Sequence, residues 1–194
     1  MRTNNPNNIV FLDIETTGLS VNQGAKICEV AMLKIKDGEE FFFNSLIHPQ
    51  IVIPEACSLI HGITDDMVKN SPKFYEVAKE IADFIAGFTL VCHNASFDLN
   101  FISKEIMESK IKSPEMYFLD TLLISRQYFS FPSNKLGEIA QTLSINVTEK
   151  HRALADVLTM RSISKYLFNN LYERGIDTLE PSYFEQSFPK SKAE

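Results

Sequence analysis

Two carboxylates stand two residues apart in an apolar stretch near the start of the chain. Asp13 and Glu15 belong to the run at 9–15, which is rich in strand-forming residues and ends at a Thr-Thr-Gly turn. In a strand, residues two apart point to the same face, so both side chains would share one side of a sheet. If they are buried, the like charges need a cation between them or a proton on one of them. The alternative is that the strand ends here and both carboxylates are exposed in a turn.

Two further aspartates occur where a ligand site could form. Asp98 follows HNASF, where a short buried strand at 89–92 is expected to give way to a helix. Ligands usually bind at such strand ends in open α/β sheets, although a first-turn aspartate can also simply cap its helix. Asp156 lies in a predicted helix after HRALA and has apolar neighbours, which is compatible with an inward-facing side chain.

The histidines cannot be ranked by spacing, because three of the four stand five residues before an aspartate. His93 ends the predicted strand at 89–92, which is typical of a hydrogen-bonded core residue, and His61 lies in a predicted loop before a helix. His151 follows a polar loop at 146–150, where a histidine can swing over a site. The residues alone leave the choice among the three open.

The donor types indicate which ions and which reaction such a site would suit. Several carboxylates with a histidine, and no cysteine or histidine cluster, favour Mg²⁺ or Mn²⁺ over zinc. Two such ions about 3.5–4 Å apart form the clamp used in phosphoryl transfer, and a neutral histidine can take a proton from water. The residue types therefore fit phosphodiester hydrolysis. The three cysteines, Cys28, Cys57 and Cys92, are interpreted as small buried hydrophobes in a reducing cytoplasm.

Composition narrows the class of protein. With 194 residues, 44% of them hydrophobic, the chain predicts one globular domain rather than a disordered or fibrous protein. A net charge of −6 argues against a broad basic surface for nucleic acid, but several carboxylates in one site would lower the charge by themselves. Apolar runs are far shorter than the roughly 20 residues of a membrane span, and no signal peptide is recognisable. We therefore expect a soluble cytoplasmic protein that does not bind membranes.

The pattern of elements predicts one α/β domain on a mixed sheet. Asp37-Gly38 between two strand-like runs indicates a hairpin, and the run at 117–119 is expected to be the last, edge strand. The predicted strands are 9–15, 27–35, 40–47, 89–92 and 117–119, and helices are predicted shortly after Thr64 and at 74–85, 97–106, 122–128, 136–143 and 153–173. Strands come mainly first and helices later, which favours a single sheet covered by helices.

Three segments resemble, in order and spacing, the motifs of the DEDDh 3′→5′ exonucleases. They are FLDIETTGL at 11–19, HNASFDLNFI at 93–102 and HRALADVLTM at 151–160. IHGIT at 60–64 and LDTL at 119–122 are similar to segments of the proofreading epsilon subunits of bacterial DNA polymerase III. The resemblance spans residue 9 to about 170.

The resemblance implies a fold and a set of roles. The fold would be ribonuclease H-like, a mixed five-stranded sheet flanked by helices, with an exonuclease domain at 1–174 and a C-terminal tail at 175–194. The implied metal ligands are Asp13, Glu15, Asp98 and Asp156, and the implied general base is His151. Contacts with the last nucleotides are implied for Thr16, Leu19, Ile60, His61 and Phe97.

The expected function is metal-dependent 3′→5′ hydrolysis of single-stranded DNA ends to nucleoside 5′-monophosphates, with two Mg²⁺ or Mn²⁺ ions. A role as a proofreading subunit of a polymerase is compatible with this activity. One alternative is an exoribonuclease that acts on short RNA or RNA 3′ ends. Another is a polymerase accessory subunit that binds nucleic acid without catalysis. In the tail, Tyr183, Phe184 and Phe188 are expected to pack back on the domain, with docking on a partner as the alternative.

Overall fold

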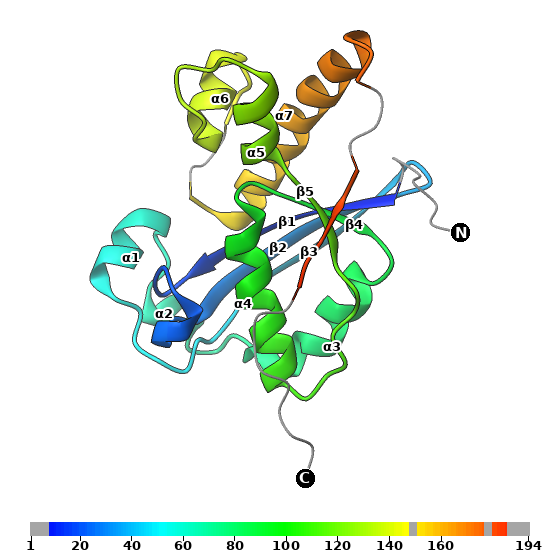
Figure 1. Cartoon of the computed structure of the whole chain (residues 1–194). Helices are drawn as coiled ribbons and strands as arrows, with labels where there is room; N and C mark the ends of the chain where they lie inside the picture. The colour runs from blue at the N-terminus through cyan, green and yellow to red at the C-terminus, as the bar shows by residue number, and fades with distance from the viewer. Residues whose placement is uncertain (1–7, 148–150, 177–179, 186–194) are drawn as a thin grey trace.

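Six strands form one mixed sheet in the computed structural model, which describes residues 8–147, 151–176 and 180–185. The spatial order is β3-β2-β1-β4-β5-β6, with β2 antiparallel to β1 and β3 while β4 runs parallel to β1 and β5. The strands are β1 (Asn8–Thr16), β2 (Ile27–Lys36), β3 (Glu39–Leu46), β4 (Thr89–Cys92), β5 (Tyr117–Asp120) and β6 (Ser182–Tyr183). The predicted mixed sheet is confirmed (Figure 1).

The hairpin between β2 and β3 follows from its two turn residues. Asp37 and Gly38 both adopt positive φ, 52° and 87°, as a two-residue turn that matches the strand twist requires. Lys36 and Glu39 close the ladder next to the turn. The hairpin predicted from the Asp-Gly pair is therefore confirmed.

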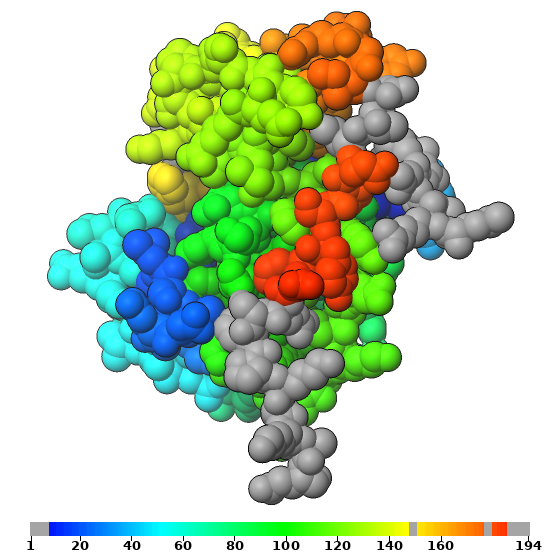
Figure 2. Space-filling view, viewed as in Figure 1, coloured from blue at the N-terminus to red at the C-terminus, as the bar shows by residue number. Residues whose placement is uncertain are grey.

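The expected edge strand and strand count need correction. Strand β5 is not an edge, because β6 pairs with it in antiparallel register through Tyr117 and Tyr183. The next residue, Phe184, is 9% exposed, packs in the main core and donates its N–H to the Met116 carbonyl at 2.9 Å. Figure 2 shows this segment in red against the green elements of the sheet and its helices. A two-residue strand has no alternation that sequence could reveal, and Phe188 lies outside the described residues.

The helices are those predicted from periodicity, with one addition before Thr64. They are α1 (Glu55–His61), α2 (Asp65–Val68), α3 (Phe74–Ile85), α4 (Ala95–Glu108), α5 (Thr121–Tyr128), α6 (Leu136–Thr142) and α7 (Ala153–Glu173), with a short 3-10 helix, η1 (Val21–Gln23). The addition is α1, which no periodic pattern in the sequence indicated. Pro54 takes its N-cap position, where a missing N–H costs nothing. His61, predicted in a loop, is therefore the last residue of α1.

The alternation of β1 sends its residues to two different helix layers. Val10, Leu12 and Ile14 belong to the large core with α3 and α4, whereas Phe11 belongs to a second core with Val157 of α7. In Figure 1 helix α4 crosses one face of the sheet and α7 lies behind it. Across the described parts of the chain, no helix combines the length and apolar character needed to span a membrane.

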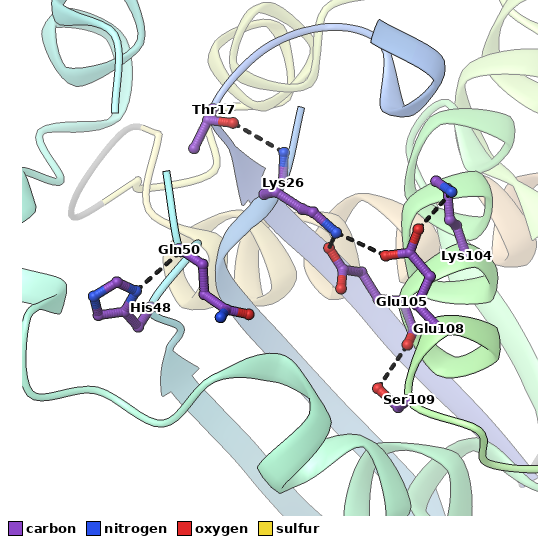
Figure 3. A network of polar contacts seen from close by, with 8 residues as sticks. All are labelled: Thr17, Lys26, His48, Gln50, Lys104, Glu105, Glu108 and Ser109. Carbon is purple, nitrogen blue, oxygen red and sulfur yellow. Dashed lines mark hydrogen bonds and ion pairs between the residues drawn. The ribbon is translucent and has the colours of Figure 1, made fainter. Parts of the chain in front are cut away.

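A polar network ties the start of β2 to α4 (Figure 3). The Lys26 ammonium contacts Glu105 at 3.2 Å and Glu108 at 2.7 Å, and Lys104 pairs with Glu108 at 2.6 Å. The backbone N–H of Lys26 donates to the Thr17 hydroxyl at 2.9 Å. Since Glu105 is only 7% exposed, this network holds a buried carboxylate by a structural ion pair.

Candidate active site

Three carboxylates meet at the end of β1. Asp13 and Glu15 point to the face opposite the buried Leu12 and Ile14, and α7 brings Asp156 to the same place. One oxygen from each of the three carboxylates lies within 4.8 Å of the others. The period of two along β1 therefore does place its two acids together, and the alternative of two carboxylates merely exposed in a turn is wrong because both are half-buried within the strand.

Asp98 approaches this cluster from the other helix layer but is not among the three carboxylates whose oxygens lie within 4.8 Å of one another. It lies in the first turn of α4, directly after the buried strand β4, and is 3% exposed. Its carboxylate accepts backbone hydrogen bonds from its own N–H and from Ile14. Its charge acts on Asp13, whose pKa it helps to raise. The strand-to-helix junction thus delivers the fourth predicted carboxylate to the end of β1.

The cluster is electrostatically unfavourable without a counterion. Burial, followed by the charges of Asp98 and Asp156, holds the pKa of Asp13 well above its usual range. Burial and the Asp156 charge raise the pKa of Glu15 to about 8. Burial also raises the pKa values of Asp98 and Asp156. Because the donors are carboxylate oxygens, the residues fit a hard divalent cation such as Mg²⁺ or Mn²⁺.

His151 stands at the rim of the cluster. It is exposed, has φ of 57° and immediately precedes the start of α7. Its backbone makes a hydrogen bond with the Asp156 carboxylate, and its side chain helps to offset the rise in the pKa of Asp156. In Figure 2 the yellow-gold start of α7 is visible in the indentation between the cyan α1 segment and the yellow-green α5 and α6.

An exonuclease family model, RNase_T, matches residues 10–163. The chain belongs to this exonuclease family. The DNA polymerase III PolC-type protein of Clostridium perfringens is 34% identical over 182 residues, which cover 90% of this chain and 12% of that protein. The DNA polymerase III epsilon subunit of Rickettsia typhi is 31% identical over 166 residues, 79% of this chain and 71% of the subunit. The chain thus spans about an eighth of the PolC-type relatives it matches.

Solved structures agree on the fold. Exonuclease X in complex with 5′ overhanging duplex DNA has a TM-score of 0.67 at 23% identity, over 84% of this chain and 92% of that one. The nuclease domain of 3′hExo, described as a DEDDh family member bound to rAMP, has a TM-score of 0.71 at 18% identity, over 93% and 97%. The expected ribonuclease H-like fold and the resemblance to DEDDh exonucleases are confirmed.

Two apolar side chains among the predicted nucleotide contacts project into solvent. Leu19, in the turn after β1, is 89% exposed, and Ile60, on α1, is 61% exposed. The turn itself is rigid, because the buried Thr16 hydroxyl donates to the Gly18 carbonyl at 2.7 Å. Exposed apolar side chains on an ordered turn or helix are suited to stacking against nucleotide bases. That role stays a prediction for these residues.

His61 and Phe97 are placed differently from these two. His61 is buried, and its Nδ1 accepts the N–H of Ile63 at 3.0 Å while the ring also bonds the backbone of Thr16. Because Nδ1 accepts this hydrogen bond, the ring proton is assigned to Nε2, and burial lowers the pKa of the ring. Phe97 is half-buried and packs on Phe101 with ring centroids 5.0 Å apart. Both side chains are held by contacts within the protein, and their predicted contacts with nucleotides stay predictions.

The structure adds a fifth carboxylate that sequence reasoning missed. Glu29 on β2 is 1% exposed, faces Glu15 across the β1–β2 ladder and forms an ion pair with Arg152 at 2.8 Å. Its charge contributes to the raised pKa of Glu15. One signal could have found it: it is the single acidic residue in the apolar run at 27–35.

Asp120 is a second residue whose importance only the structure reveals. It ends β5, and its carboxylate accepts the N–H groups of Asn94 at 3.1 Å and Ala95 at 3.0 Å, where α4 begins. It also accepts the N–H of Leu122 at 2.9 Å, in the first turn of α5. One carboxylate therefore caps two helices and fixes the helix that carries Asp98. It belongs to the LDTL segment already noted in the sequence.

Proposed function

We propose that this chain is a metal-dependent 3′→5′ exonuclease that removes nucleoside 5′-monophosphates from single-stranded DNA ends and uses two divalent ions. The observation that carries the proposal is the group of three carboxylates, Asp13, Glu15 and Asp156, whose charges together with that of Asp98 raise the pKa of Asp13 and which have His151 beside them. A cluster so costly without cations is expected at a site that works with cations bound.

The chain's own groups account for the proton transfer. Asp13, Glu15, Asp98 and Asp156 would hold the ions, which when bound stabilise charge on the attacking and leaving oxygens. The imidazole of His151 takes one proton from the water that attacks phosphorus, and the P–O3′ bond breaks. The released 3′ oxygen takes up a proton from solvent. His61 is not suited to this step, because its ring is buried and hydrogen-bonded within the protein.

Two features suit the end of a nucleic acid of any sequence, and the names of the relatives favour DNA. Leu19 and Ile60 offer apolar surface that can contact any base, which suits an enzyme without sequence preference. The net charge of −6 is unsuited to holding a long polyanion, so a few terminal nucleotides would be bound. Relatives at 31–34% identity carry the names of DNA polymerase III proteins, which also supports work alongside a polymerase.

The test is hydrolysis of matched 5′-labelled single-stranded DNA and RNA with Mg²⁺, Mn²⁺ or EDTA, resolved at single nucleotides. We expect a metal-dependent ladder that shortens from the 3′ end, faster on DNA. A faster ladder on RNA would assign the chain to the exoribonucleases. Binding without cleavage under both metals would instead identify an accessory subunit. His151→Gln is the matched variant: it should bind the oligonucleotide and release product at least about 100-fold more slowly.

A further inference from the structure

The start of α7 is anchored to β2 by one buried side chain. Both oxygens of Glu29 are engaged: Oε1 accepts from Nη2 of Arg152 at 2.8 Å, and Oε2 accepts from Nε of the same guanidinium at 3.2 Å. Oε2 also accepts the backbone N–H of Ala153, the first residue of α7, at 3.1 Å. A two-pronged guanidinium contact fixes direction as well as distance.

These bonds lie next to the residues that the proposed chemistry needs. His151 directly precedes Arg152, and its backbone is bonded to the Asp156 carboxylate one turn further along. Glu29 thus fixes Arg152 and Ala153, while Asp156 fixes the residue before them. A carboxylate at a helix N-terminus is also stabilised by the N–H groups that lack partners within the helix. Three consecutive residues are therefore held to the face of the sheet that carries Asp13.

We propose that Glu29 and Arg152 form a positioning pair that holds the first turn of α7, and with it His151 and Asp156, against the carboxylates of β1. This inference rests on the proposed nuclease function. Neither residue touches the reacting atoms in this scheme. The pair acts through the backbone of residues 151–153, and a displacement of about 1 Å there would be enough to cost roughly 100-fold in rate.

The geometry separates this role from that of an additional metal ligand. Among the described residues, the acids whose oxygens come within 4.8 Å of one another are Asp13, Glu15 and Asp156, and both Glu29 and Asp98 lie outside this group, so the distinction rests on where the oxygens of Glu29 are engaged. Glu29 directs both of its oxygens to Arg152 and the helix start instead. A ligand role predicts weaker metal binding when Glu29 is neutralised, whereas a positioning role predicts slower turnover with metal binding retained.

The variants Glu29→Gln and Arg152→Lys test the pair, with Glu105→Gln as the matched control. Gln keeps the size and acceptor oxygen of Glu29 but loses the ion pair, and Lys keeps the charge of Arg152 without its two-pronged geometry. Glu105 is likewise a buried glutamate held by a cation, but its partner is Lys26 and it lies on α4, about two turns after Asp98. The probe is the p-nitrophenyl ester of thymidine 5′-monophosphate with Mn²⁺, which reports kcat, KM and the Mn²⁺ dependence.

We expect kcat to fall at least about 10-fold in both variants, with KM and half-saturating Mn²⁺ within about 3-fold of wild type. The double variant should lose about as much as the worse single variant, because the two residues act as one unit. Glu105→Gln should keep kcat within about 2-fold. Wild-type kcat in both variants would overturn the proposal, and so would a loss of Mn²⁺ affinity in Glu29→Gln that accounts for its lower rate.

A readout without turnover separates this inference from the proposed function. The ring resonances of His151, assigned with a His151→Gln variant, should shift in Glu29→Gln and stay in place in Glu105→Gln. An inactive wild-type protein would refute the nuclease function, and the resonances would still decide whether the pair positions His151. If Glu29→Gln fails to fold, Arg152→Lys carries the test, because this side chain is partly exposed and keeps its charge.

Discussion

Glu15 and Glu29 face each other across strands β1 and β2, yet they have different partners. Opposed like charges destabilise a sheet, and burial makes the repulsion stronger. Arg152 relieves it, because the guanidinium pairs with Glu29 and also lowers the pKa of Glu15 from where burial would set it. Arg152 therefore engages Glu29 in a structural ion pair and leaves the carboxylate of Glu15 available to a cation.

Neutralising Asp98 should stop turnover without loosening the fold. Asp98→Asn keeps the side chain's size at a position that is 3% exposed and removes a charge that the other carboxylates repel. We expect kcat to fall at least about 1,000-fold, since a ligand and its charge are lost, while the metal-free melting temperature does not fall. Asp83→Asn, an exposed aspartate paired with Lys79, is the control and should keep full activity. Wild-type rates from Asp98→Asn would remove Asp98 from the site.

The pKa of Glu15 predicts how the stability of the metal-free protein depends on pH. The folded value of about 8 exceeds the ordinary 4.5, so the folded state binds the proton more tightly than the unfolded state. Glu15 therefore destabilises the fold increasingly as pH rises from about 4.5 to 8, and below this window it has no such effect. Glu15→Gln should melt progressively higher than wild type between pH 5 and pH 8 in EDTA.

Saturating Mn²⁺ should reverse this difference, because a bound cation favours the ionised carboxylate that only the wild-type protein has. Comparing the two proteins at each pH cancels the contribution of the histidines. A gap in melting temperature that stays constant from pH 5 to pH 8 would contradict the raised pKa of Glu15.

Removing the shared cap at Asp120 should destabilise the protein more than an ordinary surface change. Asp120→Ala takes acceptors from the N–H groups of Asn94, Ala95 and Leu122. At about 1 kcal/mol for each helix cap, plus the cost of leaving buried N–H groups unsatisfied, we expect a loss of about 2–4 kcal/mol in urea unfolding. Asp66→Ala, also in a first helical turn but highly exposed, should change stability by less than about 0.5 kcal/mol.

The exposed side chains of Leu19 and Ile60 should affect the binding of oligonucleotides but not of a minimal substrate. Leu19→Ser and Ile60→Ser remove apolar contacts from side chains that are 89% and 61% exposed, so stability should hardly change. We expect KM for a single-stranded oligonucleotide to rise about 5–10-fold, in line with the loss of about 1–1.5 kcal/mol of stacking. Hydrolysis of the p-nitrophenyl nucleotide should stay within about 2-fold. An equal effect on both substrates would instead mean that the substitutions distort the cluster.

Sequence patterns predicted what depends on local periodicity. The alternation around Asp13 and Glu15 and the Asp-Gly turn are local features, and the structure has them as expected. Helix α1 was not predicted, because a proline at an N-cap cannot be distinguished in sequence from a proline that breaks a helix. The partnership of Glu29 and Arg152 could not be derived, because it depends on which face of the sheet α7 covers.

The 123-residue separation between Glu29 and Arg152 bears on when the carboxylate cluster is assembled during synthesis of the chain. Contacts between such distant parts of a chain form late in folding, because a long loop must close before they contribute. A chain still emerging from the ribosome holds Asp13, Glu15 and Asp98 well before Asp156 and the helix that carries it. The site is thus completed only when α7 docks, so a partly synthesised chain lacks both its last carboxylate and His151.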